Sequence, residues 1–172
     1  DENLFGRNFD YVHSIGLIVR TQPKNGYESI SLVNLNHLGL SLENMPTKNF
    51  INRVITLAAP YAPLDGMNEK GLCVGTFYFP TYAEYVPTTL ENQSKSLSPI
   101  DFPNWVLTQF ANLEEVKAAL GGVVIAPTLV KGWGNIPAPF HYIVFEKGGD
   151  AIVIEPMDGK LIVHPNPLGV LT

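Results

Sequence analysis

The first part of the chain alternates apolar and polar positions with a period of two, which is typical of half-buried β-strands. Residues 14–21 form the first of these runs, and residues 27–34 form the second. The segment between them, residues 23–26, contains an Asn-Gly pair, which is a strong signal for a β-hairpin. The pattern therefore predicts that the two runs pair as antiparallel strands.

The next part of the chain is harder to assign from its pattern. Residues 52–58 fit either a short helix or a buried strand. Residues 65–71 begin with Asp-Gly and are dense in turn formers, so they are predicted to form a loop. The apolar, β-rich run 71–79 that follows is predicted to be a strand, and it contains Cys73.

Helical spacing is clear only in the middle of the chain. Residues 101–110 have apolar positions at helical spacing and a proline in the first turn. Residues 112–120 begin with Asn112 and have Glu115 three positions later, which matches a capping box. Residues 121–139 are rich in Gly and Pro and are predicted to form a long loop, where binding residues are common.

The last third of the chain predicts a β-meander, because residues 140–145, 151–154 and 161–164 are apolar runs separated by turns that contain glycine. Strands outnumber helices along the whole chain, so the predicted fold class is α+β with antiparallel sheets dominant. About seven strands against one or two helices would leave sheet faces uncovered, which fits a truncated domain.

Composition narrows the class of protein. The chain of 172 residues can form one domain with a buried core, and its 45% of apolar residues excludes a disordered chain. The 11 basic and 16 acidic residues give a net charge of −5, which argues against binding to nucleic acid or to a membrane surface. The low share of charged residues (16%) and the apolar C-terminal residues suggest surfaces that another segment covers, so we expect a piece of a longer chain.

Isolated residues give few candidates for chemistry. A single cysteine excludes an internal disulfide framework, and Cys73 is interpreted as a buried core residue, with a thiol nucleophile as the alternative. The four histidines lack metal-ligand spacing, so no metal site is predicted. His141 lies in an apolar strand, which favours a core role over that of a base. The sequence has no phosphate-binding loop and no Gly-x-Ser-x-Gly motif, and no cofactor is expected.

Arg7 and Asp10 form the remaining candidate pair. Positions three apart in a strand face opposite sides, so these side chains share a site only if the backbone turns between them. A guanidinium beside a carboxylate could hold an anionic nucleophile while the carboxylate accepts hydrogen bonds from an amine. A salt bridge on an edge strand is the alternative, which the pattern alone favours.

Seven segments taken together resemble the choloylglycine hydrolase family, which comprises conjugated bile salt hydrolases and penicillin V acylases. They follow the family's order along nearly the whole chain: residues 4–10 (LFGRNFD), 65–72 (DGMNEKGL), 79–85 (FPTYAEY), 113–117 (LEEVK), 140–142 (FHY), 152–156 (IVIEP) and 169–172 (GVLT). The resemblance implies an N-terminal nucleophile hydrolase with a four-layer αββα sandwich, here truncated. Residues 1–172 would be part of a single domain that lacks its extreme N-terminus and its C-terminal half.

The resemblance also implies a mechanism. In the family, a cysteine exposed by processing becomes the first residue, and its own α-amino group acts as the base for its thiol. Arg7 and Asp10 match the arginine and aspartate beside that cysteine, for thiolate stabilisation and amine orientation respectively. The backbone N–H of Tyr78 would help to form the oxyanion hole. The nucleophile would lie upstream of Asp1, so we expect the chain as given to be inactive.

Substrate preference depends on one position. Bile salt hydrolases usually carry Asn where this chain has Tyr78, whereas tyrosine is more typical of penicillin V acylases. The sequence therefore favours an acylase-like cysteine hydrolase of linear amides, with conjugated bile salt hydrolysis as the alternative and a noncatalytic ligand-binding relative as an alternative of a different class. The predicted apolar walls of the substrate pocket are Phe9, Leu64, Val130 and Trp133.

The resemblance further implies the setting in which the protein works. We expect a bacterial, cytoplasmic hydrolase whose parent is a homotetramer. Its partner would be a small-molecule amide, penicillin V or a conjugated bile salt, with no nucleic acid, membrane, metal or cofactor involved.

Overall fold

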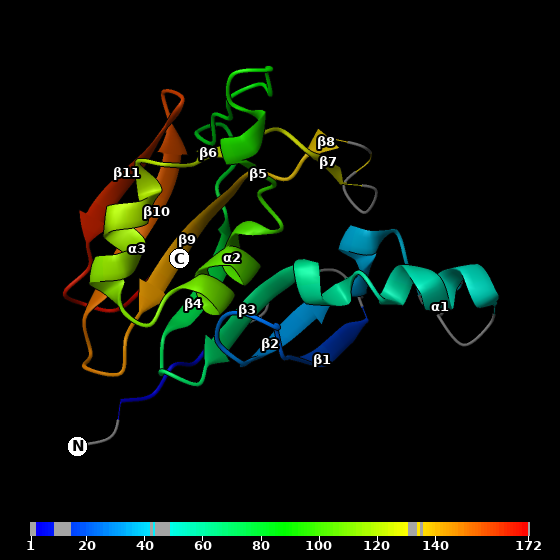
Figure 1. Cartoon of the computed structure of the whole chain (residues 1–172), viewed down its shortest axis with the longest axis horizontal. Helices are drawn as coiled ribbons and strands as arrows, with labels where there is room; N and C mark the ends of the chain where they lie inside the picture. The colour runs from blue at the N-terminus through cyan, green and yellow to red at the C-terminus, as the bar shows by residue number, and fades with distance from the viewer. Residues whose placement is uncertain are drawn as a thin grey trace.

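A seven-stranded antiparallel sheet forms the centre of the molecule, in the order β1-β2-β3-β4-β9-β10-β11 (Figure 1). The computed structural model describes residues 3–8, 15–41, 43, 49–130, 134 and 136–171. The strands of this sheet are β1 (Gly16–Thr21), β2 (Ser29–Asn34), β3 (Pro63–Asn68), β4 (Cys73–Tyr78), β9 (Phe140–Phe145), β10 (Ala151–Met157) and β11 (Lys160–Pro165). The predicted α+β class is confirmed.

Both predicted antiparallel regions are present. β1 pairs with β2 from Gly16 opposite Asn34 to Thr21 opposite Ser29, and the connecting loop contains Gly26 at a φ of +126°. β9, β10 and β11 form the predicted meander. The alternation of side chains fixes the register of such strands, since a slip of one residue would turn every apolar side chain to the other face.

The prediction of a loop over residues 65–71 is wrong for its first half. These residues begin inside β3, which pairs with both β2 and β4. Gly66 serves close packing there, because a Cβ would lie 2.7 Å from the Leu107 side chain and 2.8 Å from a backbone oxygen of β2. The turn comes later, at Gly71 (φ +81°), and the side-chain oxygen of Asn68 accepts two of its backbone N–H groups.

Two helices, α2 (Phe102–Gln109) and α3 (Leu113–Leu120), lie on one face of the sheet, which we call the covered face (Figure 1). Both match helices predicted from the sequence. The main core lies between these helices and the sheet and includes Leu72, Val74, Phe102, Val106, Leu107, Val116, Tyr142, Val144, Ile152 and Ile154. A smaller core of Val33, Leu35, Leu40, Ala59 and Ala62 forms beside the 3-10 helices η1 (Leu35–Leu38) and η3 (Ala59–Tyr61).

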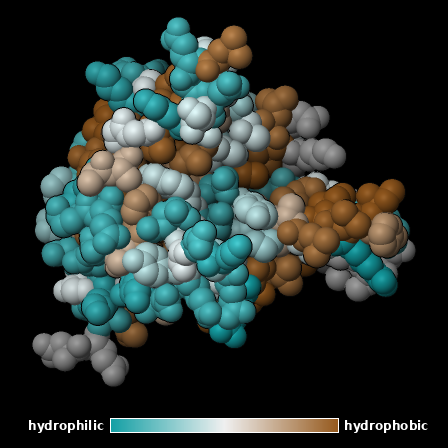
Figure 2. Space-filling model, viewed as in Figure 1, coloured by the Kyte–Doolittle hydropathy of each residue, from teal (hydrophilic) through white to brown (hydrophobic). Residues whose placement is uncertain are grey.

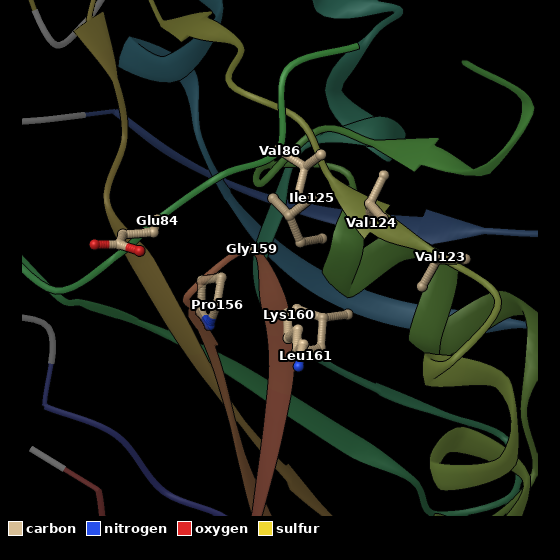
Figure 3. A pocket seen from close by; sticks show the side chains of 9 residues that line it. All are labelled: Glu84, Val86, Val123, Val124, Ile125, Pro156, Gly159, Lys160 and Leu161. Atoms are coloured by element: carbon tan, nitrogen blue, oxygen red, sulfur yellow. The ribbon is translucent and has the colours of Figure 1, made fainter. Parts of the chain in front are cut away.

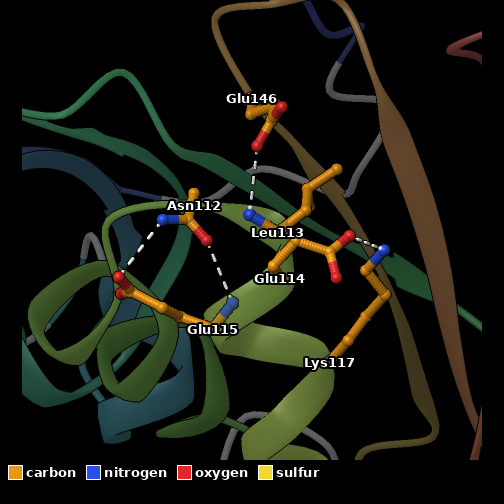
Figure 4. A network of polar contacts seen from close by, with 6 residues as sticks. All are labelled: Asn112, Leu113, Glu114, Glu115, Lys117 and Glu146. Carbon is orange, nitrogen blue, oxygen red and sulfur yellow. Dashed lines mark hydrogen bonds and ion pairs between the residues drawn. The ribbon is translucent and has the colours of Figure 1, made fainter.

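The start of α3 confirms the predicted cap (Figure 4). The Asn112 side chain accepts the backbone N–H of Glu115 at 3.0 Å, and the Glu115 carboxylate accepts that of Ala111 at 2.7 Å. Glu146, in the turn after β9, accepts the backbone N–H of Leu113 at 3.1 Å. These bonds satisfy donors that the first turn of a helix leaves without intrahelical partners. They also join α3 to the meander.

Residues 52–58, which the sequence left between helix and strand, fall mostly in α1 (Phe50–Thr56). The side chain of Asn49 caps this helix by accepting the backbone N–H of Asn52 at 2.7 Å. α1 projects from the sheet, and its surface is apolar in Figure 2. The exposed fractions are 78% for Phe50, 69% for Ile51, 75% for Leu57 and 63% for Tyr61.

The predicted long loop over residues 121–139 is partly wrong, because it contains three strands of two residues each. They are β6 (Val124–Ile125), β7 (Leu129–Val130) and β8 (Ile136–Pro137); β7 pairs with β8, and β6 pairs with β5 (Ser96–Leu97), which follows the 3-10 helix η4 (Gln93–Lys95). Two residues are too few for any hydrophobic period to show. None of the helices in the described part of the chain has the length and apolarity of a membrane-spanning helix.

Candidate active site

The face of the sheet opposite α2 and α3, which we call the open face, carries the N-terminal segment 3–8. This segment has no regular secondary structure, and side-chain contacts hold it. The Asn3 side chain donates to the backbone oxygen of Lys147 at 2.8 Å, and the ring centroids of Phe5 and Phe145 lie 6.4 Å apart. The segment is therefore attached to β9 and the turn that follows it.

Arg7 is the functional candidate in this segment. Its Nη1 donates a charge-assisted hydrogen bond to the carboxylate of Asp65 on β3. Its guanidinium carbon also lies 4.6 Å from the centroid of the Phe77 ring on β4, which is a cation–π contact. The side chains of Arg7 and Asp65 are 16% and 12% exposed, so the ion pair is largely out of solvent.

Asp65 is held from two sides. Besides Arg7, the backbone N–H of Thr76 on the neighbouring β4 donates to its carboxylate. Burial raises the pKa of Asp65 above its ordinary value, while Arg7 and the Thr76 N–H oppose that rise. The charge on Arg7 therefore stabilises a carboxylate that the protein interior disfavours.

A cavity of about 160 Å³ lies beside Arg7 on the open face. Residues 4–6 line one side of it and residues 169–171 line another, while Phe77, Ile143 and Phe145 form its floor. Tyr78, the last residue of β4, directly follows Phe77. A cavity of this size holds a small acyl or amino group rather than a whole drug-sized ligand. Arg7 follows the lining residue Gly6 in the chain and contacts Phe77 of the cavity floor, so a fixed cation lies close to this small cavity.

The family assignment follows from a comparison of the sequence with models of known families. The model described as "Linear amide C-N hydrolases, choloylglycine hydrolase family" matches residues 1–172. The chain belongs to the choloylglycine hydrolase family. This family is the one that the seven ordered segments resemble, so the assignment made from them is confirmed.

Individual family members agree with this assignment. A bile salt hydrolase/transferase of Clostridium perfringens is 33% identical over 172 residues, which cover 99% of this chain and 49% of that protein. A penicillin V acylase of Pectobacterium atrosepticum is 29% identical over 102 residues, which cover 58% of this chain and 27% of that protein. The chain thus spans about half the length of the bile salt hydrolases that it matches.

A solved structure also resembles this one. It is a cysteine-to-alanine mutant of the conjugated bile acid hydrolase of Clostridium perfringens, with a TM-score of 0.63 and 27% identity, covering 95% of this chain and 46% of that one. The fold of the described residues therefore resembles that of a conjugated bile acid hydrolase, which confirms the predicted resemblance to N-terminal nucleophile hydrolases.

A second cavity is too small to matter for a substrate (Figure 3). It lies between the loop after β4, the strand β6 and the turn between β10 and β11, with Val86, Ile125 and Leu161 among its lining residues. Its volume of about 10 Å³ fits a single water molecule at most. The open face, which carries Arg7 and the larger cavity beside segment 3–8, is the better candidate for the active site.

His141 occupies the open face beside Phe77 but has the features of a core residue. It is 4% exposed, its ring stacks on Phe79 at 4.4 Å, and its Nδ1 lies 3.4 Å from the Glu155 carboxylate. Burial lowers the pKa of His141, and Glu155 opposes that change. Glu155 also contacts His164 at 3.2 Å. No group of three side chains within the described ranges has the arrangement of a metal site.

Cys73 is buried at 3% exposure, as its apolar surroundings predicted. Burial raises the pKa of its thiol to about 11, so it is almost entirely protonated at neutral pH. The thiolate is the nucleophilic form of cysteine. The core interpretation of Cys73 is confirmed.

The other predicted site residues are scattered. Leu64 and Val130 are buried at 4% and 1%, and Val130 belongs to the main core of the covered face. Tyr78 is 55% exposed at the end of β4. Asp10, the predicted partner of Arg7, lies outside the described residues, as do the predicted pocket residues Phe9 and Trp133.

Sequence reasoning missed Asp65 as the partner of Arg7. The two residues are 58 positions apart, and the Asp-Gly pair at Asp65 was interpreted as a turn signal. One signal in the sequence could have placed Asp65 in a strand. Pro63 and Leu64 form an apolar run directly before Asp65, and a strand with one charged position fits this run as well as a turn does.

Proposed function

We propose that the complete protein hydrolyses linear amide C–N bonds outside peptides, with a cysteine upstream of Asp1 as nucleophile. Arg7 supports this proposal most directly. It is the only residue of segment 3–8 that brings a positive charge to the open face, and it contacts Phe77, which lines the small cavity. Residues 1–172 would then be part of one domain whose remaining parts complete the site.

Each step of the proposed reaction has a group to perform it. The α-amino group of the cysteine takes the thiol proton, and Arg7 stabilises the thiolate that attacks the amide carbon. The backbone N–H of Tyr78 donates to the oxyanion of the tetrahedral intermediate. The ammonium formed on the α-amino group gives its proton to the leaving amine, and the neutral amino group then takes a proton from the water that hydrolyses the acyl-enzyme and returns it to the thiolate as the acid is released. Asp10 would orient the amino group of the cysteine.

Conjugated bile salts and penicillin V are the two candidate substrates. The relatives with the broader match are named bile salt hydrolases, with 33% identity over 99% of the chain. Tyr78 and the shorter match to a penicillin V acylase favour the second substrate. Leu64, Val130, Phe9 and Trp133 stay predictions for the pocket walls.

The experiment is to express the full-length protein and measure release of glycine, taurine or phenoxyacetate from glycocholate, taurocholate and penicillin V. We expect turnover of at least one amide, and the ratio of kcat/KM values assigns the branch. A mature protein with no N-terminal cysteine and no turnover would support the noncatalytic relative instead. The 172-residue chain alone is expected to be inactive, and sedimentation of the full-length protein tests the predicted homotetramer.

A further inference from the structure

We infer that Asp65 is a positioning residue for Arg7: its carboxylate fixes the direction of the guanidinium and offsets part of the positive charge that a nucleophile beside Arg7 would meet. This inference rests on the proposed function, since it assigns Arg7 to the thiolate. It adds to that function a residue on another strand, 58 positions from Arg7 in the sequence.

The first argument is that the backbone around Arg7 does not by itself fix its side chain. Segment 3–8 has no helix or strand, so no ladder of backbone hydrogen bonds aligns it. The position of the guanidinium of a long, flexible arginine side chain is determined instead by its contacts. Asp65 accepts a hydrogen bond from Nη1, and the guanidinium carbon lies over the Phe77 ring, 4.6 Å from its centroid. These two contacts restrict the position of the head group.

The second argument is that Asp65 is itself fixed. It lies in β3 opposite Gly75 of β4 and Leu32 of β2, so its backbone is paired on both sides. The N–H of Thr76 donates to its carboxylate. Gly66, the next residue, packs directly under Leu107 of α2. Asp65 therefore anchors Arg7, which lies in a segment without regular structure, to the sheet.

The third argument concerns charge. A lone arginine in a largely buried site would lower the pKa of a neighbouring thiol strongly, whereas an arginine paired with a carboxylate does so less. The other titratable side chains described on this part of the open face are His141, opposite Phe77 on β9, Glu155 and His164 beside it, and the buried Cys73 on β4. Substitution of Asp65 leaves these groups in place, so its effect on the nucleophilic thiol can be measured separately.

The test uses three variants of the full-length protein. Asp65→Asn keeps an oxygen acceptor but removes the charge, Asp65→Glu keeps the charge but moves it, and Asp65→Asn in an Arg7→Lys background tests whether the effect passes through Arg7. Glu28→Gln is the matched control, because it breaks the solvent-exposed ion pair between Arg20 of β1 and Glu28, the residue before β2. The measurements are kcat, KM, their pH profiles and the pH dependence of cysteine alkylation.

For Asp65→Asn we expect kcat to fall about tenfold with KM changed less than about twofold, since one charge-assisted hydrogen bond is weakened. The acid limb of the kcat/KM profile and the thiol pKa from alkylation should both move to lower pH. For Asp65→Glu we expect a similar fall in kcat with the acid limb unmoved. In the Arg7→Lys background, Asp65→Asn should change kcat less than about twofold, and Glu28→Gln should change nothing.

Two results would overturn the inference while leaving the proposed function intact. One is an active wild type in which both Asp65 variants keep the wild-type kcat and pH profile. The other is an equal loss with and without the Arg7→Lys substitution, which would mean that Asp65 does not act through Arg7. If Asp65→Asn does not fold, the kcat of Asp65→Glu is the test: a fall of about tenfold supports the inference, and a wild-type kcat overturns it. A wild type that cleaves none of the three amides contradicts the proposed function itself, and the alkylation profile then still reports whether Asp65 acts on the thiol.

Discussion

The two faces of the central sheet differ in what packs against them. On the covered face, residues such as Val74, Tyr142 and Ile154 have no exposed surface and pack against α2 and α3. On the open face, the buried side chains include the ionisable Asp65 and His141 besides apolar ones such as Cys73 and Ile143. Apolar residues there stay exposed, at 70% for Ile18, 57% for Ile30 and 53% for Met67. One sheet thus has a face covered by two helices and a face that holds a largely buried ion pair in place.

The difference shows how stability and chemistry are divided in this segment. Apolar packing on the covered face needs only side chains of suitable volume, and it tolerates no charge. The open face instead holds an ion pair whose burial is unfavourable by itself, and retains it against a rigid strand. Regions in which local rules of stability are broken are common at functional sites.

The largest effect is expected from a cavity in the covered face. Phe102→Ala removes a fully buried ring whose centroid lies 4.3 Å from that of the Tyr142 ring. We expect a loss of about 4 kcal/mol in the free energy of unfolding, measured by urea denaturation of the full-length protein. Met67→Ala on the open face is the control and should lose less than about 1 kcal/mol, because Met67 is half exposed. Equal losses would contradict the division between the two faces.

A slightly smaller effect is expected when the buried ion pair is broken. Arg7→Met leaves Asp65 buried without its cation, and we expect a loss of about 3 kcal/mol near pH 8. Without Arg7 the pKa of Asp65 rises further above its ordinary value, so the neutral carboxyl is tolerated at low pH and the penalty grows as pH rises through that pKa. Denaturation at pH 5 and pH 8 checks this; a loss that is larger at pH 5 would contradict it.

The covered face has its own pH dependence through His37. This residue is 6% exposed, its ring centroid lies 5.7 Å from that of Phe140, and burial lowers its pKa to about 4. The unfolded chain binds a proton at pH 6.5 and the folded chain does not, so stability is complete above pH 6.5 and is lost as pH falls towards 4. We expect a loss on the order of 2 kcal/mol over that window, which His37→Gln should largely remove. An unchanged profile in that variant would exclude His37 as the cause.

The smallest effect is expected at the helix caps. Asn112→Ala removes the cap of α3, which packs on the core, and should lower the free energy of unfolding by about 1 kcal/mol. Asn49→Ala removes the equivalent cap of α1, which projects from the sheet. We expect that variant to increase amide hydrogen exchange within α1 with a smaller effect on global unfolding. The reverse ranking would mean that α1 is part of the cooperative core.

The sequence predicted the covered face better than the open face, for a physical reason. Strand alternation, the Asn112 cap and the apolar stripe of α2 are local patterns, and each is readable within ten residues. The Arg7–Asp65 pair joins positions 58 apart, and no local pattern carries that contact. The turn signal at Asp65-Gly66 was misleading because Gly66 is there for close packing under Leu107.

The candidate site was predicted only in part. Arg7 followed from the resemblance of residues 4–10 to the family, and the structure places it on the open face beside a cavity. The same resemblance gave no indication that Asp65 would be its partner. Tyr78 shows the limit of single positions, since its side chain favours one substrate while the broader sequence matches favour the other.

One measurement tests most directly whether the open face around Arg7 is where the amide is cleaved. The kcat/KM of the full-length protein on its best amide substrate is compared between Arg7→Lys and Arg20→Lys, with folding of both verified. Arg20 is the matched control, because its ion pair with Glu28 is on the same sheet but exposed to solvent. The account predicts that Arg7→Lys loses about 100-fold in kcat/KM, while Arg20→Lys stays within about twofold. Equal activity of the two variants would contradict it.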